Sequence, residues 1–150
     1  MYNRCNTYEM IPFIAIGDPH ISDRHMSMTI EALNNAYEVV NKRRDVTFVV
    51  VMGDVFDRHN NVKLEHMKIA FDWLRKISSI TRTYVLVGNH DRVHNKDFLS
   101  SIHPYMGLAS DKLHIIDKPH IRCGERYKVC FMPYVPPGRF KEVSNTSVLI

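Results

Sequence analysis

The sequence has no long apolar run and few cysteines. Its 150 residues are 45% hydrophobic, but no stretch approaches the roughly 20 apolar residues of a membrane-spanning helix. Residues 1–7 also lack the apolar stretch that a signal peptide needs. The three cysteines, Cys5, Cys123 and Cys130, form no CxxC pair and are odd in number, which does not indicate a disulfide framework. We therefore expect an intracellular protein with reduced thiols.

A strong excess of charge is also lacking. The formal net charge is +4 and the pI is near 9.0, so the chain is only mildly basic. Basic chains often bind nucleic acid. The densest basic cluster, residues 42–44, lies at the end of a predicted helix, where cations complement the helix dipole. The charge therefore does not identify the binding partner. The ordinary composition predicts one globular domain over residues 1–150.

What the sequence does have is a regular alternation of apolar runs and amphipathic stretches. Residues 11–16, 46–52 and 83–87 have the continuous apolar character of buried strands. Between them, residues 26–41 and 64–80 have helical spacing of apolar positions. This order predicts βαβ units, a mostly parallel sheet and an α/β fold. Later strands are predicted at 113–116 and 120–123, around a Lys118-Pro119 turn, and at 127–132, antiparallel to its neighbour.

Each of the first three predicted strands ends at a glycine that polar residues follow. The carboxyl ends of parallel strands meet at one edge of a sheet, where ligands collect in α/β proteins. We therefore expect three loops to bring their side chains to one edge. The loops are Gly17-Asp18-Pro19-His20, Gly53-Asp54-Val55-Phe56-Asp57 and Gly88-Asn89-His90-Asp91.

These side chains have the chemistry of a two-metal site. Carboxylate and amide oxygens with imidazole nitrogens suit Mn²⁺, Fe, Zn²⁺ or Ni²⁺ better than Ca²⁺. Asp18 and His20 can reach one ion, Asp54 can bridge two, and Asn89 offers an amide oxygen to the second. Two such ions can clamp a phosphoryl group. His90 is placed to protonate a leaving oxygen, and Asp91, its neighbour, can hold the imidazole in orientation.

The set D-x-H, G-D-x-x-D and G-N-H-D, carried by these three loops in this order, resembles the calcineurin-like metallophosphoesterases. The resemblance implies a four-layer αββα sandwich, of which this chain is the N-terminal portion, and a dinuclear centre, with Mn²⁺ as the first choice of metal. It implies metal ligands at Asp18, His20, Asp54 and Asn89 and catalysis by His90.

Within that family, residues 53–58 are similar to the DNA-repair nucleases of the SbcD type. Residues 131–140 are similar to a stretch in nuclease-like members found in phages and large DNA viruses. These resemblances imply a DNA nuclease or phosphodiesterase, a nucleic-acid substrate and an SbcC-like coiled-coil ATPase as partner. Arg58 and His59 are candidate contacts to substrate phosphate, and a solvated loop is the alternative. A protein phosphatase or nucleotide phosphodiesterase is the alternative activity.

The sequence also departs from the family pattern. Members supply three further histidines downstream, two of them in a G-H-x-H motif, and neither feature occurs here. Residues 148–150 resemble the apolar runs that precede the earlier loops. We therefore expect a domain truncated at its C-terminus, with little turnover by itself; a catalytically incomplete binding module is the alternative. His103, His114 and His120 are expected to have structural or surface roles, His103 at a helix end.

Overall fold

The computed structural model describes residues 11–144, apart from residues 60, 95, 97, 125 and 126. Cys5 and the apolar run at 148–150 lie outside the described residues. The elements along the chain are β1 (Phe13–Ile16), η1 (Asp23–His25), α1 (Met26–Lys42), β2 (Phe48–Val51), α2 (Leu64–Ile80), β3 (Thr83–Leu86), β4 (Leu113–Ile116), β5 (His120–Cys123), β6 (Lys128–Phe131) and α3 (Phe140–Ser144).

Four strands form a parallel sheet in the order β1-β2-β3-β4. All four residues of β2 and all four of β3 are buried. This explains their continuous apolar and β-branched sequences, because a central parallel strand is covered on both faces. The predicted α/β fold with a parallel sheet built from βαβ units is confirmed.

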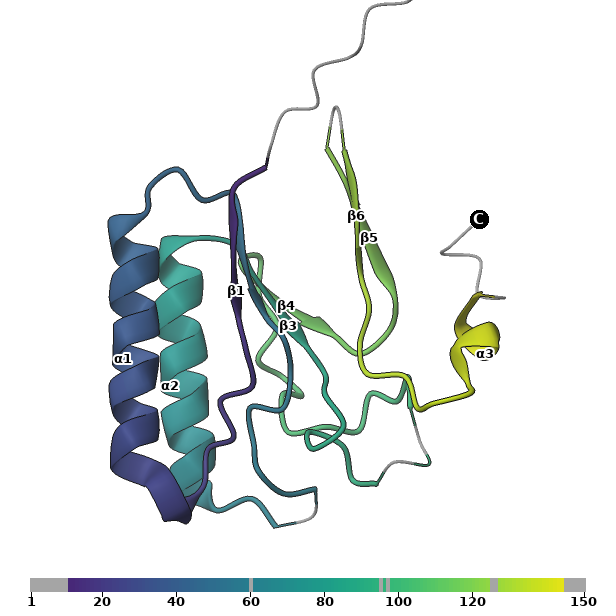
Figure 1. Cartoon of the computed structure of the whole chain (residues 1–150), viewed down its shortest axis with the longest axis horizontal. Helices are drawn as coiled ribbons and strands as arrows, with labels where there is room; N and C mark the ends of the chain where they lie inside the picture. The colour runs from purple at the N-terminus through teal and green to yellow at the C-terminus, as the bar shows by residue number, and fades with distance from the viewer. Residues whose placement is uncertain (1–10, 60, 95, 97, 125–126, 145–150) are drawn as a thin grey trace, which may run out of the picture.

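The helices α1 and α2 cover one face of this sheet (Figure 1). Their buried side chains pack against Val49, Val51 and Val85 in one apolar cluster. Trp73 of α2 donates a hydrogen bond from Nε1 to the carbonyl of Leu33 in α1, at 2.9 Å. Trp73 is 5% exposed and belongs to this cluster. No helix among the described residues is long and apolar enough to cross a membrane.

The opposite face is covered by the β5–β6 hairpin, which is antiparallel as predicted (Figure 1). Phe131 of β6 packs against Phe48, Tyr84 and other residues of the sheet. The strands β4 and β5 belong to different sheets, so the turn between them carries the chain from one layer to the next. Within the described part of the chain, the second sheet of the expected sandwich consists of β5 and β6, and the short helix α3 lies beyond them.

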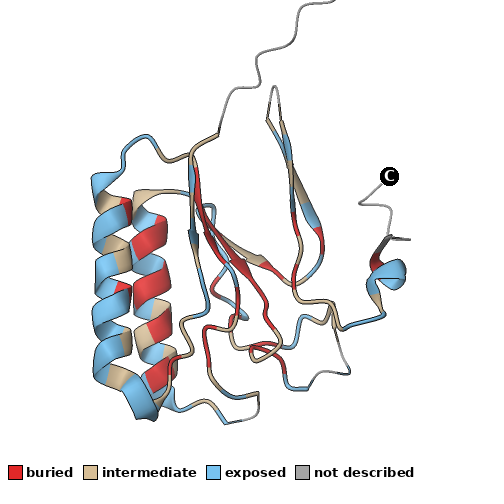
Figure 2. Ribbon diagram, viewed as in Figure 1, coloured by how far each residue is buried: buried red, intermediate tan, exposed pale blue. Residues whose placement is uncertain are grey.

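The distribution of burial follows these layers. Buried residues line the sheet and the inner sides of the helices, whereas the outer sides of the helices and much of the hairpin are exposed (Figure 2). Cys123 and Cys130 in the hairpin are exposed free thiols, in agreement with the expectation of reduced cysteines.

Candidate active site

The three glycine loops leave the same edge of the parallel sheet. Ile16, Val51 and Val85 are register partners at the ends of β1, β2 and β3, so the loops that follow them start side by side. The first two loops remain paired beyond the strands. His20 donates its backbone N–H to the carbonyl of Asp54 at 3.0 Å, and Ile21 donates to Val55 at 2.8 Å.

Two glycines allow the second and third loops to approach closely. A Cβ on Gly53 would lie 2.9 Å from the backbone of Gly88, and a Cβ on Gly88 would lie 2.1 Å from Oδ1 of Asp54. Gly53 also has a φ of 98°, which side chains with a Cβ rarely adopt. Both positions therefore require glycine, and their contact places the Asp54 carboxylate against the loop that carries Asn89 and His90.

The backbone is unusual at two of the candidate ligands. His20 and Asp54 have φ values of 44° and 47°, in the left-handed region that few non-glycine residues occupy. Such conformations are unfavourable, persist only where surrounding contacts impose them, and cluster at functional sites. For Asp54, one such contact is a hydrogen bond from the backbone N–H of His90 to Oδ1, at 2.9 Å.

His90 lies at the centre of a cluster of rings. Its Nδ1 is 2.8 Å from the carbonyl of Asp57. Because a carbonyl only accepts hydrogen bonds, Nδ1 carries a proton, and this contact leaves Nε2 as the ring nitrogen that can exchange a proton. The ring contacts His20 edge-on, with centroids 5.2 Å apart, and stacks on His59 at 4.8 Å.

Asp91 faces away from the His90 ring and joins the loops instead. Its side chain is 1% exposed and accepts hydrogen bonds from the backbone N–H groups of Gly88 at 3.0 Å and Phe56 at 3.3 Å. The predicted orienting contact to His90 is therefore made by the Asp57 carbonyl, a backbone group that no motif reveals. Burial raises the pKa of Asp91, and burial and the Asp91 charge raise that of Tyr105 beside it.

The predicted metal ligands share this edge but do not close around one point. Asp18 is exposed, and His20, Asp54 and Asn89 are partly buried. In the described part of the chain, no three His, Cys, Asp or Glu side chains gather as a metal site.

Two observations nevertheless fit a divalent cation. Nδ1 of His20 is buried, makes no hydrogen bond to a described residue and lies 3.7 Å from Oδ1 of Asp57, beyond hydrogen-bond distance. It is thus an imidazole nitrogen with a vacant bonding position. The mixed oxygen and nitrogen donors along the edge have the chemistry of a transition-metal site.

The two predicted substrate contacts lie beside this edge. His59 stacks on His90, and its Nδ1 is buried without a hydrogen bond to the described residues. Arg58 is exposed and lines a hollow of about 340 Å³ together with Asp57. His66 of α2 lines the same hollow and is 7% exposed, with Nε2 3.0 Å from Oδ1 of Asp23. Nothing in the spacing of the sequence marks His66 or Asp23 for this position.

The other histidines have the structural or surface positions expected of them. His103 is buried, with Nε2 3.6 Å from Asp117, and His114 stacks on Tyr84 with centroids 4.9 Å apart. His120 is exposed. The expectation that His103 ends a helix is wrong: it lies in an irregular segment of turns, because Pro104 and Gly107 interrupt helical structure there.

The parallel α/β sheet, with its three polar loops beyond the strand ends, has the architecture of a phosphoesterase. The model of the calcineurin-like phosphoesterase family matches residues 11–142, and the chain belongs to this family. This confirms the resemblance drawn from the three motifs at the level of the family.

Two curated relatives are named as putative phosphoesterases. The chain is 31% identical over 139 residues to protein 078R of Invertebrate iridescent virus 3, which covers 92% of this chain and 40% of the relative. It is 32% identical over 131 residues to protein 244L of Invertebrate iridescent virus 6, which covers 87% of this chain and 46% of the relative. The chain thus spans less than half the length of these relatives.

The fold also resembles that of a solved structure, the nuclease MPE of Pseudomonas putida. The TM-score is 0.50 at 18% sequence identity, and the match covers 73% of this chain and 50% of the nuclease. At this identity the likeness concerns the fold.

Proposed function

We propose that this chain forms part of a divalent-metal-dependent phosphodiesterase whose active site lies at the carboxyl edge of the β1–β4 sheet. The observation that carries the proposal is the contact between Gly53 and Gly88. It places the carboxylate of Asp54 against the loop of Asn89 and His90. This joins two of the family's motifs into one site, as a shared metal centre requires.

Asp18, His20, Asp54 and Asn89 would hold two divalent ions, with Mn²⁺ as the first choice and Fe, Zn²⁺ or Ni²⁺ as alternatives. When bound, such ions supply positive charge that offsets the charge developing on the phosphoryl oxygens. Asp54 has two carboxylate oxygens, and the hydrogen bond from His90 occupies Oδ1. Its second oxygen is thus left for an ion.

The protein side chains would supply the proton transfer and the alignment. His90, with both ring nitrogens protonated, would give the Nε2 proton to the leaving oxygen of the ester and keep the proton on Nδ1. The Asp57 carbonyl would keep Nδ1 protonated and fix the plane of the ring. Asp91 would act as a positioning residue, because its two backbone hydrogen bonds hold the Asp54 loop against the His90 loop.

We propose DNA as the substrate and a nuclease of the SbcD type as the specific activity. The G-D-x-x-D loop with Arg58 supports this, as does the similarity of residues 131–140 to nuclease-like members of the family. An SbcC-like coiled-coil ATPase as partner, a role in DNA repair and an intracellular location belong to the same proposal. A protein phosphatase or nucleotide phosphodiesterase is the alternative within the family.

The activity is proposed for the whole protein, since the chain spans 40% and 46% of its curated relatives. For residues 1–150 by themselves, we expect Mn²⁺ binding at Asp18, His20 and Asp54 with little turnover. A catalytically incomplete binding module is the alternative. The coding sequence beyond Ile150 separates the two. An open frame with a histidine directly after the apolar run and then G-H-x-H favours the enzyme, whereas a stop favours the module.

The experimental test has two steps. Mn²⁺ binding to residues 1–150 is measured by electron paramagnetic resonance for the unaltered chain, for Asp54→Asn and for Asp72→Asn, a matched control on the exposed side of α2. We expect binding in the unaltered chain and the control, and its loss in Asp54→Asn. Absence of binding in the unaltered chain would overturn the metal proposal.

The second step measures hydrolysis of bis-p-nitrophenyl phosphate and of DNA with Mn²⁺, by residues 1–150 and by any longer product. Turnover by the longer product that His90→Asn abolishes supports the proposed activity. Rapid turnover by residues 1–150, abolished by the same substitution, would contradict our expectation for this chain. A longer product that binds Mn²⁺ but cleaves neither substrate would overturn the phosphodiesterase proposal.

A further inference from the structure

A hollow of about 340 Å³ lies beside the candidate active site. Its volume is within the range of small-molecule binding pockets, roughly 300–1,000 Å³. Asp57 belongs to both the candidate active site and the hollow. Its carbonyl contacts His90, its carboxylate lies 3.7 Å from His20, and the residue lines the hollow. A substrate held at the carboxyl edge of the sheet can therefore extend into this hollow across Asp57.

Three cationic side chains line the hollow: Arg24 after β1, Arg58 after β2 and Lys63 before α2. Arg24 and Arg58 are exposed and form no hydrogen bond or ion pair with a described residue. Ser22 and Asn61 add a hydroxyl and an amide to the lining. Unpaired guanidinium groups with neutral donors beside them are suited to the oxygens of a phosphate.

The third cation, Lys63, is already paired with Asp23, an exposed carboxylate that lines the same hollow. Asp23 accepts a hydrogen bond from Lys63 and lies 3.0 Å from Nε2 of the buried His66. The Lys63 hydrogen bond lowers the pKa of Asp23, so this carboxylate is ionised at neutral pH. Asp23 therefore places a negative charge in a hollow lined by three cationic side chains and by Asp57, and it competes with any anionic ligand for Lys63.

We propose that this hollow binds a second phosphate of a polynucleotide, adjacent along the backbone to the phosphate at the candidate active site. Arg24 and Arg58 would contact this phosphate, and Asp23 would limit the affinity by holding Lys63. The inference rests on the proposed phosphodiesterase function and deepens it. It makes the site selective for a chain of phosphodiesters over a substrate with a single phosphate.

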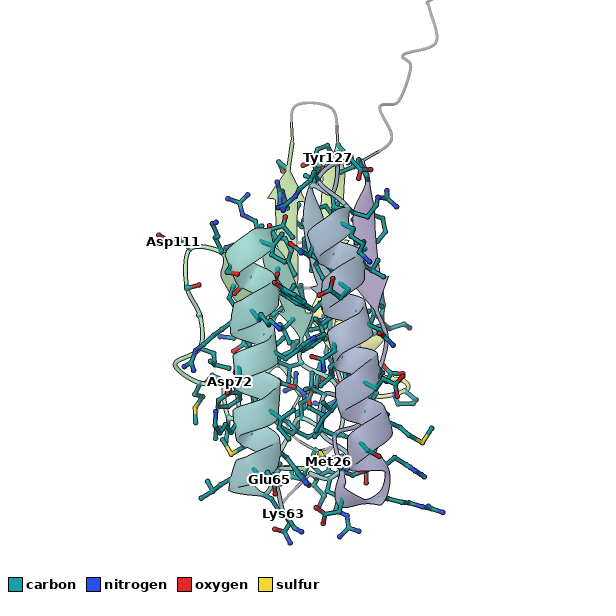
Figure 3. The ribbon with its side chains drawn as sticks, turned by 90° about the vertical axis from the view of Figure 1, so that its left-hand side faces the viewer. Met26, Lys63, Glu65, Asp72, Asp111 and Tyr127 are labelled. Carbon is teal, nitrogen blue, oxygen red and sulfur yellow. The ribbon has the colours of Figure 1, made fainter. Side chains whose placement is uncertain are left out.

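The geometry of the helix pair offers matched controls. Met26 and Lys63 lie at the same end of the helix pair, whereas Asp72 lies further along α2 (Figure 3). Asp72 pairs with Lys68 on the exposed surface of that helix, so it repeats the Asp23–Lys63 pair away from the hollow. Arg44 and Arg75 are exposed arginines that do not line the hollow.

The test measures binding of a fluorescein-labelled oligothymidylate by fluorescence anisotropy, in EDTA, so that neither metal nor cleavage contributes. We expect the double variant Arg24→Gln, Arg58→Gln to bind about ten-fold more weakly, since each exposed ion pair contributes modestly. The slope of log affinity against log salt should fall by about 0.7, because the loss of one phosphate contact to a single strand contributes about 0.7. The control Arg44→Gln, Arg75→Gln has the same net charge and should change binding much less.

Removal of the Asp23 charge gives a second test, in which binding is expected to become tighter. Asp23→Asn should tighten oligonucleotide binding about three-fold, because it releases Lys63, whereas Asp72→Asn should not match this gain. Circular dichroism verifies that each variant is folded. The inference is overturned if the two arginine pairs have equal effects, if Asp23→Asn and Asp72→Asn are equivalent, or if ADP displaces the oligonucleotide at equal phosphate concentration.

These outcomes are separate from those of the proposed function. Binding through the hollow by a protein that cleaves no phosphodiester would sustain the inference and overturn the activity. Cleavage of bis-p-nitrophenyl phosphate by a protein whose oligonucleotide binding is unchanged by substitution of Arg24 and Arg58 would support the activity and overturn the inference.

Discussion

The two faces of the β1–β4 sheet are covered to different extents. On the helix face, Val49, Val51, Val85 and Val87 are all 0% exposed. On the hairpin face, the central residues Phe48, Val50, Tyr84 and Leu86 are buried, but residues at the edge of this face are exposed to solvent. Phe13 and Met52 there are 55% and 48% exposed, and a hollow of about 500 Å³ lies between the sheet and β6.

The difference shows which face supports the candidate site. Val55 and Phe56 of the Asp54 loop, and Tyr105, which stacks on Phe56, belong to the same apolar cluster as the helix face. A closely packed core has little freedom to shift, so these loops rest on the more rigid half of the molecule. The hairpin face has fewer constraints, and changes there should affect stability and the site less.

The largest expected effect compares one core residue on each face. Leu74→Ala on the helix face should lower the free energy of unfolding by about 4 kcal/mol, because a fully enclosed cavity cannot collapse. Phe131→Ala on the hairpin face should lower it by about 2 kcal/mol, since its surroundings already border an open hollow. Urea denaturation of both variants measures this. An equal or larger loss in Phe131→Ala would show that the hairpin face is packed as rigidly as the other.

A smaller effect is expected from a change at Gly88, the glycine at the end of the third strand region. Gly88→Ala should lower the unfolding free energy by about 1–3 kcal/mol and weaken Mn²⁺ binding, because the new Cβ would lie 2.1 Å from Oδ1 of Asp54. Gly17→Ala is the matched control, since among the described residues no atom beyond its two chain neighbours lies within 4 Å of the added Cβ, and it should change stability by less than about 0.5 kcal/mol. Thermal melting and metal titration of both variants test the comparison, and similar results for the two would contradict the close contact of the loops.

The smallest expected effect is a pH dependence on the hairpin face. His114 stacks on Tyr84, and its Nε2 is buried without a hydrogen bond to the described residues. Burial, followed by the charge of Arg82, lowers its pKa below the ordinary value of 6.5. Because the folded pKa lies below the unfolded one, its contribution to stability is present above pH 6.5 and is lost as the pH falls through the folded pKa.

A titration followed by NMR should therefore give His114 a pKa below 6.5. His114→Phe keeps a ring against Tyr84 without the titrating group, so it should reduce the loss of stability between pH 7 and pH 5. His103 has a lowered pKa for the same reason, burial, so part of the dependence should remain. A pKa of His114 at or above 6.5 would mean that the hairpin leaves this ring open to water.

The repeating part of the fold was predictable because its cause is local. Apolar runs that end at a glycine predict buried parallel strands, and the three strands and two helices predicted from residue 11 to residue 87 are present. The later strands were predicted within a residue or two, but their arrangement was not. Residues 113–116 and 120–123 look like neighbours around a turn, yet β4 joins the parallel sheet and β5 joins the second. Short strands carry no pattern that specifies a partner.

In the candidate site, the motifs predicted which side chains share one edge, but not their contacts. Asp91 stands beside His90 in the sequence, yet its carboxylate bonds to Phe56 and Gly88. His66 and Asp23 are 43 residues apart, and no spacing rule joins them. These contacts depend on how loops fold back over a core, which periodicity does not describe.

The sequence by itself determined the family, the parallel sheet and the order of the three glycine loops. Strand and helix periods are local properties, and the parallel arrangement then brings the strand ends to one edge. Only the tertiary structure decided that Gly53 touches Gly88, that the Asp57 carbonyl holds His90, and that Arg24, Arg58 and Lys63 surround one hollow. The physical reason is that these contacts join residues distant along the chain, whose approach is set by the packing of α1 and α2 against the sheet.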